Sequence, residues 1–507
     1  SNDINIDTKT DILSLETIDI NANISPNDIK HVTTYPLNTS QRGIYFYTVA
    51  NQDKHHVYLE QVIYNVNMNS SNAAVATKEH LDINRLFHAY KVLISKHELL
   101  RTYFHINEET TAPIQTVVPI DSKKLQILPI TIIDNGGTDT KESMQLLDSY
   151  LSNDRKQGMD LLTPPLCRMA VQTIITEKDI VSYKLVITMH HLIHDGWSLG
   201  LFLDDLCKLY VNDNTSDDVQ TSKLPFYKYI NWEQKQEALN KQTYWDKAFV
   251  QANNKRQTTM SEEFASTRAN TIISGDIAIQ YSKPLPESTL EIMKNMSKNT
   301  GLTPSSIFQC AFILASTYKS KSHYQYGAMS SGRTAPLTGI QTLRAPLVRM
   351  LPLFFEWDPL QDTFVNMVNK LQKRLINNIE HEHDELFQGL GKLQAVFDFE
   401  PDRNFSNNVF TVETITTIDR IGYPLSIRVS YDENETYCRI LGTSEDTQID
   451  KHMLQQIIER MIMNIHIGCQ TGGSIMLNDQ RIQRKWFAPS PPIVPSTDIN
   501  KLPINLI

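Results

Sequence analysis

The sequence predicts an α/β protein made of two lobes of similar construction. Strand-like apolar runs alternate with amphipathic helical stretches along most of the 507 residues. Each half holds the same mixture of strands and crossover helices. A polar loop, Asn212 to Lys223, separates the halves. We therefore place the first lobe at residues 31–215 and the second at residues 216–482.

The composition is that of a globular chain with ample material for a core. Hydrophobic residues make up 40% of the chain, charged residues 21%, and the net charge is -9. That charge argues against nucleic acid and against an anionic membrane surface as partners. No apolar run approaches the ~20 residues of a membrane span, and we expect no signal peptide. The five cysteines lack paired spacing, so we expect reduced, buried thiols and a cytoplasmic location.

Both ends of the chain have the composition of linkers. Residues 1–30 are rich in Asp, Asn, Ser and Thr and show little periodicity. Residues 483–507 contain the proline-rich run PSPPIVPS. We expect both segments to be linkers within a longer, multidomain chain.

The first lobe is expected to begin at Tyr35. Thr39 or Ser40 is a suitable N-cap for its first helix, because a hydroxyl oxygen can accept a backbone N–H there. The further elements that the apolar spacing predicts are a strand at 58–66, helices at 82–96 and 141–153, and neighbouring strands at 168–175 and 181–189.

The second lobe is expected to begin with a long helix that carries Phe226, Trp232 and Trp245. Thr303 is placed to cap a later helix, with Pro304 at its first position. The other predicted elements are helices at 286–299, 364–381 and 450–469 and strands at 277–281, 347–357, 395–399, 425–431 and 436–441.

The most specific pattern is His-His-x-x-x-Asp-Gly, formed by His190, His191, Asp195 and Gly196 directly after a predicted strand. It should arise by accident in roughly one random chain of this length in a thousand. An imidazole on a rigid strand end can take and return a proton near neutral pH. The Asp can fix the loop through an ion pair, and Gly accepts backbone angles that other residues avoid. Ser198 is expected to cap the helix that follows.

Other candidate sites carry weaker signals. Cys310 lies in an apolar helix with no base nearby, so we do not expect it to be a nucleophile. His381, His383 and Asp384 have a metal-like composition, but i,i+2 spacing does not place two ligands on one helix face. We read them as a solvated helix end and predict no metal site. No glycine-rich phosphate cradle is present, so no nucleotide cofactor is indicated.

Four further patterns occur in a fixed order around the histidine motif. They are Pro36-Leu37-x-x-x-Gln41, His97-Glu98-x-Leu100-Arg101-Thr102-x-Phe104, the aromatic set Tyr229, Trp232 and Tyr244-Trp245, and Ser331-Gly332-Arg333. With these patterns the chain, over about residues 30 to 482, resembles a condensation domain of a nonribosomal peptide synthetase. That family lies within the superfamily that resembles chloramphenicol acetyltransferase.

The resemblance implies a fold, a reaction and partners. The fold would be two chloramphenicol-acetyltransferase-like lobes in a V arrangement with a tunnel between them. Donor and acceptor peptidyl carrier protein domains would dock at its two ends, next to other synthetase domains of the same chain. No cofactor would bind directly, because the substrates arrive as thioesters on the phosphopantetheine arms of the carriers. The acceptor amine would attack the donor thioester and form an amide.

The resemblance also implies roles for individual residues. His191 would orient and deprotonate the amine, and the N–H of Gly196 would face the developing oxyanion. Asp195 would be structural, and His190 would support the loop. The residues that would line the tunnel or contact substrate are Trp197, Ser331, Arg333 and Arg349, with Arg101 as structural support.

The chain departs from the family pattern at three places. Lys96 stands where the family has an arginine, and lysine is a poorer bidentate partner, so Arg333 or Arg101 is expected to pair with Asp195 instead. Arg349 and Met350 replace an Asn-Thr pair, which places the acceptor side of the tunnel or the choice of substrate in question. The late His-Gln-Asp pattern is reduced to His383-Asp384.

Several related functions fit less well or stay open. An epimerization domain would need a glutamate that we do not find, and a heterocyclization domain would replace the histidines by aspartate. A terminal macrocyclizing condensation domain and an acyltransferase that takes coenzyme A remain enzyme alternatives. A catalytically silent platform that docks carriers or partners is the alternative outside the enzymes. The sequence leaves the donor, the acceptor and their stereochemistry open.

Overall fold

A computed structural model describes the chain over residues 33–51, 57–69, 80–133, 140–175, 181–212, 223–239, 244–248, 279–317, 322–384, 393, 395–401, 404–407, 409–419, 423–431, 438–444 and 449–477. The two predicted linkers, 1–30 and 483–507, and most of the predicted boundary loop lie outside these residues.

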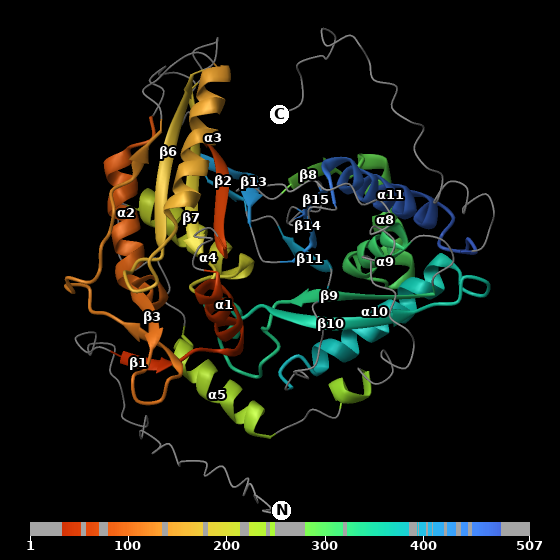
Figure 1. Ribbon diagram of the computed structural model, residues 1–507. Coiled ribbons are helices and arrows are strands. Elements are labelled where there is room, and N and C mark those ends of the chain that lie inside the picture. Colours follow the sequence, from red (N-terminus) through yellow and green to blue (C-terminus); the bar gives the residue numbers. More distant parts are fainter. Residues whose placement is uncertain are drawn as a thin grey trace, which may run out of the picture.

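Six strands form the first sheet, in the order β12 (Phe405–Ser406), β13 (Phe410–Ile418), β2 (Leu59–Met68), β7 (Val181–His190), β6 (Cys167–Ile175) and β5 (Thr131–Ile132) (Figure 1). β6 and β7 pair antiparallel along their whole length, which confirms that the strands predicted at 168–175 and 181–189 are neighbours. β7 pairs antiparallel with β2 as well. The strand that leads to the histidine motif is therefore held from both sides.

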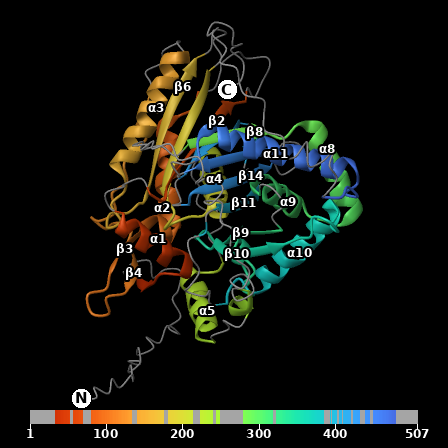
Figure 2. The same ribbon diagram turned by 45° about the vertical axis from the view of Figure 1, so that its right-hand side comes forward.

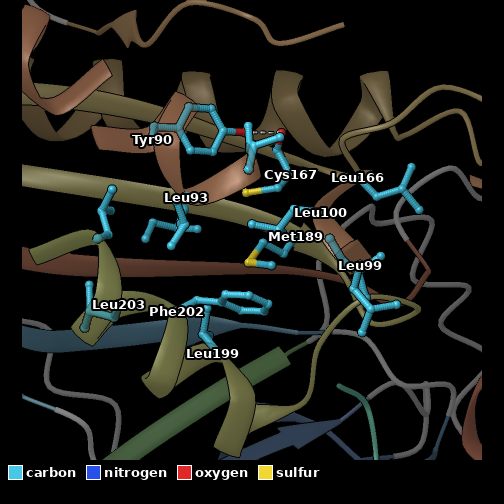
Figure 3. Packing of buried hydrophobic residues seen from close by; sticks show 14 of the residues in the cluster. Tyr90, Leu93, Leu99, Leu100, Leu166, Cys167, Met189, Leu199, Phe202 and Leu203 are labelled. Carbon is cyan, nitrogen blue, oxygen red and sulfur yellow. Dashed lines mark hydrogen bonds between the residues drawn. The ribbon is translucent and has the colours of Figure 1, made fainter. Parts of the chain in front are cut away.

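Helices cover both faces of the first sheet because the residues of its central strands alternate in direction. Leu185 and Ile187 of β7 join the core under α2 (Ile83–Lys96) and α4 (Gly196–Val211). Val186 lies on the opposite face, with Leu151 of α3 (Thr140–Gln157). Figure 3 shows the core under α4, where leucines of three segments pack around Met189 and the Tyr90 hydroxyl donates to the Cys167 carbonyl at 2.7 Å.

Two smaller elements stand beside the first sheet, at the end where the histidine motif lies. One is a sheet of three strands, β1 (Thr33–Pro36), β4 (Pro113–Val117) and β3 (Thr102–Ile106), preceded by the short helix η1 (Glu98–Arg101). The other is α1 (Thr39–Ala50), whose Gln41 side chain donates to the Leu192 carbonyl at 2.8 Å. This bond attaches α1 to the loop that follows His191.

The second sheet also has six strands, in the order β10 (Arg349–Glu356), β9 (His323–Ser330), β11 (Ala395–Pro401), β14 (Leu425–Tyr431), β15 (Cys438–Ser444) and β8 (Ile279–Pro284). Four helices lie on one face of it, α8 (Glu287–Thr300), α9 (Pro304–Ser316), α10 (Phe364–Glu380) and α11 (Lys451–Gln470) (Figure 2). α9 is buried on all sides from Ser306 to Ser316, and it packs against α11 on the sheet. The other face of the sheet is turned to the first lobe.

The packing does not follow the predicted boundary at residue 215. β12 and β13 come late in the chain yet extend the first sheet, where β13 pairs with β2 at eight register positions. α5 (Phe226–Ala238) and the segment 335–347 also pack into the first core. β13 satisfies the edge of β2, whose backbone groups would otherwise lack partners. Neither β12 nor β13 was predicted, because the threonine-rich run at 410–418 is only partly buried and shows weak apolar alternation.

Some helix boundaries differ from the prediction because carboxylates and amides take the capping positions. Asn38, not Thr39 or Ser40, caps α1 through a capping box with Gln41. Asp195, not Ser198, caps α4, and Ser198 is its partner in a second capping box. The long aromatic helix is two pieces, since α5 ends at Ala238 and Trp245 lies in a separate helical turn at 244–248. The predicted Thr303 cap of α9 is confirmed.

The remaining expectations about the chain can be compared with the structure directly. All five cysteines are buried and unpaired, as the spacing predicted. Among the helices of the described segments, none has the length and apolar character needed to cross a bilayer.

Candidate active site between the two lobes

The histidine motif occupies a tight turn between β7 and α4. The backbone N–H of His191 donates to the Tyr58 carbonyl at 2.9 Å, which extends the β2–β7 pairing by one residue. The N–H of Leu192 donates to Nδ1 of His190 at 3.2 Å. His190 is buried, and burial together with the charges of His191 and His194 lowers its pKa to about 3. His190 is thus held as a neutral ring that accepts a hydrogen bond from the turn.

Asp195 ties the turn to the second half of the chain. Its Oδ1 accepts from the Ser198 N–H at 2.7 Å, and its Oδ2 accepts from the Leu347 N–H at 2.9 Å. The Arg333 guanidinium donates to both oxygens, at 2.8 and 3.1 Å. Burial alone would raise the pKa of Asp195, but the Arg333 charge and these hydrogen bonds lower it. Asp195 is therefore a buried carboxylate that fixes geometry.

Of the two arginines expected to pair with Asp195, only Arg333 does. Arg101 is buried in the first lobe, where its guanidinium donates to the Val118 carbonyl. Gly332, which precedes Arg333, has a φ of 66°, and a Cβ there would lie 1.8 Å from the Leu347 carbonyl oxygen. Only glycine fits at that position, so the Ser-Gly-Arg loop can approach the segment that also contacts Asp195.

A cavity of about 510 Å³ lies between the lobes, where the tunnel was expected. Its wall includes His191, Gly196 and Trp197 from the motif, and Ser331, Arg333 and Arg349 from the second half. All the residues predicted to line the tunnel thus meet at one cavity. Other residues in its wall come from α1, β9, β10, β11 and β14, among them Ser40, Met329, Met350, Asp398, Glu400 and Arg428. Asp419 and Tyr423, which lie between β13 and β14 in the chain, line it as well.

His191 pairs with a carboxylate that sequence reasoning missed. Its Nε2 lies 3.2 Å from Oδ1 of Asp419, just beyond the end of β13. Burial lowers the pKa of His191, but the charge and hydrogen bond of Asp419, with the charge of Glu60, raise it to about 9. Burial raises the pKa of Asp419, and the His191 charge and hydrogen bond lower it to about 2. The pair is therefore an imidazolium and a carboxylate near neutral pH.

Four carboxylates surround one guanidinium, three of them in the cavity wall and one, Glu60, behind it. We call this set the Arg428 cluster: Arg428 with Glu60, Asp398, Glu400 and Asp419, at 3.1 to 3.3 Å. Asp398 and Arg428 are register partners on adjacent parallel strands, β11 and β14. Burial raises the pKa of Asp398 and outweighs the nearby Arg428 charge. The single positive charge of Arg428 therefore does not compensate the negative charges of all four carboxylates.

His194 lies behind His191 and contacts the same cluster. The two rings stack with centroids 4.7 Å apart, and His194 Nδ1 lies 3.6 Å from Oε2 of Glu60. Burial and the His191 charge lower the pKa of His194 to about 4. Glu60, His191 and His194 offer ligand atoms within 4.8 Å of one another, a set that would suit Zn²⁺ by ligand type. We assign no metal there, because Glu60 already pairs with Arg428 and His191 with Asp419.

Gly196 owes its identity to a close contact. A Cβ at this position would lie 2.0 Å from Oε2 of Glu400, while its φ is not in the left-handed region. The sequence suggested that this glycine is needed for unusual backbone angles. The structure shows instead that a side chain at this position would collide with Glu400. As the first residue of α4, Gly196 has an N–H that no earlier carbonyl of the helix can accept. Glu400 lies beside the place where an oxyanion was expected.

The remaining predicted site residues are held in place by polar contacts. The Trp197 indole donates to the Gln341 carbonyl at 2.9 Å, and Arg333 lies over its ring. Arg333 donates its backbone N–H to Oγ of Ser331 at 3.3 Å. Arg349 donates to Oε1 of Glu233 at 3.1 Å and contacts His383 Nδ1 at 3.3 Å. The substitution of Asn by Arg349 therefore brings its own ion pair.

The group at the end of α10 is not a solvated helix end. His381 pairs with Asp384 at 2.6 Å and stacks on Tyr244 at 4.0 Å. His383 is largely buried and contacts Arg349 and, at 3.3 Å, Glu382. The two histidines belong to different contact networks.

A comparison of the chain with known families is decisive at this point. The Condensation domain family model matches residues 31–465. The chain belongs to the condensation domain family. The role of this family is the formation of amide bonds in nonribosomal peptide synthesis, as the histidine motif and the other patterns indicated.

Curated relatives of this condensation domain are peptide synthetases. Gramicidin S synthase 2 of Aneurinibacillus migulanus is 24% identical over 356 residues, 70% of this chain and 7% of that protein. Bacitracin synthase 1 of Bacillus licheniformis is 25% identical over 429 residues, 82% of this chain and 7% of that protein. The chain thus spans only a small part of the length of these relatives.

Solved structures share the fold. The first condensation domain of the calcium-dependent antibiotic synthetase, in complex with a substrate analogue, has a TM-score of 0.70 at 15% identity and covers 88% of this chain and 98% of its own. A four-domain nonribosomal peptide synthetase bound to AMP and glycine has a TM-score of 0.62 at 13% identity, with 89% of this chain and 34% of its own covered. The predicted α/β fold is confirmed, and it is shared with solved condensation domains.

Proposed function

We propose that this condensation domain joins a donor acyl or peptidyl thioester to the amine of an acceptor aminoacyl thioester at His191. Each thioester is carried on the phosphopantetheine arm of a peptidyl carrier domain, and neighbouring synthetase domains supply those carriers. One observation supports this above all others: the His191 ring lies in the wall of a cavity that both lobes line. Two arms that enter such a cavity can meet at one imidazole.

Most of the rate would come from holding the two reactants together. A thioester is already an activated acyl group, and well-oriented intramolecular reactions reach effective concentrations of about 10⁵–10⁸ M. The turn around His191 is rigid, because Asp195 and His190 fix it from both sides. This domain would thus supply orientation and one proton acceptor.

The proton balance follows from the pair of His191 and Asp419. An α-amine has a pKa of roughly 8, below the value of about 9 for His191. The Asp419 carboxylate stabilises the proton on His191, so the acceptor amine enters the reaction as the neutral base. The neutral amine attacks the thioester carbon, the new C–N bond forms, and the C–S bond breaks. The His191 proton passes to the departing thiolate, and the neutral imidazole that remains takes the extra proton from the nitrogen of the new amide.

The oxyanion of the tetrahedral intermediate needs a hydrogen-bond donor. We assign this role to the N–H of Gly196, at the positive end of α4. Substrate binding has to displace the Glu400 carboxylate from beside Gly196 first, because two negative oxygens repel each other there.

The test uses the domain with two loaded carrier proteins and identification of the product by intact mass. We expect His191→Ala to lower the transfer rate by about 10²–10⁴-fold, the usual contribution of a general base. His452→Ala, a histidine on exposed α11 surface, is the matched control and should transfer at the wild-type rate. Unchanged transfer in His191→Ala, or no transfer by the folded wild type, would support the silent docking platform instead.

A further inference from the structure

The Arg428 cluster contains more negative charge than the assigned chemistry uses. Four carboxylates, Glu60, Asp398, Glu400 and Asp419, share one guanidinium and the His191 ring. With all of them ionised, the cluster keeps two negative charges even when His191 is an imidazolium. Buried charge without an opposite charge is unfavourable, so such a wall attracts a cation.

The fourth acid, Glu60, lies behind the cavity wall and adds to its negative charge. Glu60 is only 3% exposed, yet its Oε2 has no hydrogen-bond partner among the described residues. That oxygen faces His194, which lines the cavity. The raised pKa of Asp398 agrees, because burial near other acids is not balanced by Arg428.

Aromatic rings complete the surroundings of the cluster. Tyr58, Phe399, Tyr423 and Tyr431 all line the cavity, and Phe399 stacks on Tyr431 at 4.8 Å. Ring faces attract alkylammonium and guanidinium groups, and carboxylates accept their N–H bonds. Acids and rings together distinguish an organic cation from an apolar side chain.

We propose that the Arg428 cluster selects a substrate whose side chain carries a positive charge, an alkylammonium or a guanidinium group. The proposal rests on the condensation function and names the class of amino acid that one of the two arms delivers. Glu400 is the residue placed to meet this group, because its side chain is 27% exposed, the most open of the four acids. Movement of Glu400 toward the cation would also free the space beside Gly196.

The test compares ornithine with norvaline, which has the same carbon chain without the terminal ammonium. Each is loaded on the acceptor carrier and, separately, on the donor carrier, with glycine on the other arm. We expect ornithine to be transferred about 10- to 100-fold faster than norvaline on one arm, as hydrogen bonds to charged groups predict. Glu400→Gln should reduce that ratio at least several-fold. Glu459→Gln, an exposed acid on α11, should leave it unchanged.

Binding measurements separate failure of this proposal from failure of the condensation function. Calorimetry with the ornithyl and norvalyl amides of pantetheine needs no transfer, and we expect the ornithyl amide to bind more tightly. Absence of transfer for every pair would overturn the condensation function, while the binding ratio still decides the substrate class. Equal rates and equal affinities for the two amino acids would overturn the cation proposal. An equal loss of transfer rate for ornithine and norvaline in Glu400→Gln would also overturn it, because Glu400 would then bind the α-ammonium group that both amino acids share.

Discussion

At the scale of single residues, the chemistry of the site depends on partners that come from distant parts of the chain. His191 and Asp419 are 228 positions apart, yet their side chains form one ion pair. Asp419 brings a negative charge to a buried imidazole and thereby changes which protonation state prevails. The histidine motif alone therefore does not determine how its second histidine acts.

Replacement of Asp419 tests this dependence. In Asp419→Asn the pKa of His191 should fall from about 9 toward its ordinary range, since the charge that stabilises the imidazolium is gone. The raised folded-state pKa of His191 stabilises the wild type fully below pH ~6.5, and this contribution is lost as the pH rises through about 9. Titration of the His191 ring by nuclear magnetic resonance measures the shift. An unchanged pKa would contradict the pairing.

The contact between Gly196 and Glu400 makes a second prediction at this scale. Gly196→Ala should push the Glu400 side chain aside, and we expect a loss of transfer activity with about 1 kcal/mol or less of lost stability, because the end of a flexible side chain can move. When Glu400→Ala is also present, Gly196→Ala should reduce transfer activity and stability less than it does in the wild type. Additive effects, measured in a double-mutant cycle, would argue against the contact.

Sequence reasoning predicted one side of this site and missed the other. His190, His191, Asp195 and Gly196 form a compact pattern, so their proximity follows from chain order. Asp398 and Glu400 alternate with Phe397 and Phe399, and that spacing shows that both acids share one strand face. It does not show which residues this face meets, because that depends on how the second sheet packs against the first lobe.

At the scale of elements, α4 begins where the turn of the motif ends, and one side chain controls both. Asp195 caps the helix, and it also holds Arg333 and the backbone of Leu347 from the second half. The sequence predicted this helix and its buried face, but it assigned the cap to Ser198. Both side chains can accept a backbone N–H, and the ion pair with Arg333 selects the aspartate.

Replacement of Asp195 should therefore lower the free energy of unfolding more than replacement of an ordinary helix cap. We expect Asp195→Ala to lower the free energy of unfolding by about 3–5 kcal/mol, because Arg333 is left buried without its partner. Asp450→Ala removes the exposed cap of α11 and should cost only about 1 kcal/mol. Urea unfolding of both variants measures the difference. Equal losses would show that the ion pair adds nothing to the cap.

At the scale of the whole molecule, the two lobes are not built from two successive stretches of chain. β13 completes the first sheet, and residues around 335–347 fill part of the first core. The sequence showed two halves of similar composition, and the boundary at residue 215 followed from a polar loop. Which sheet a late strand joins is decided by long-range pairing, and local periodicity does not contain that information.

A truncated chain tests this arrangement. A fragment that ends at residue 239 keeps β2, β6 and β7 but loses β13 and the segment at 335–347. We expect it to lack a cooperative thermal transition, since β2 would expose an unpaired edge and the core would be incomplete. The full chain should unfold cooperatively under the same conditions in circular dichroism. A cooperative transition of the fragment would show that the first lobe folds alone.

The passage of β13 into the first sheet limits how the lobes can move. Eight residue pairs join β13 to β2, and Asp419 follows directly after the last of them. β13 therefore connects the second half of the chain to the first sheet. The two lobes cannot separate unless the β2–β13 pairs break. The same pairing holds Asp419 beside His191, so the ion pair of the site is maintained as long as the first sheet is intact.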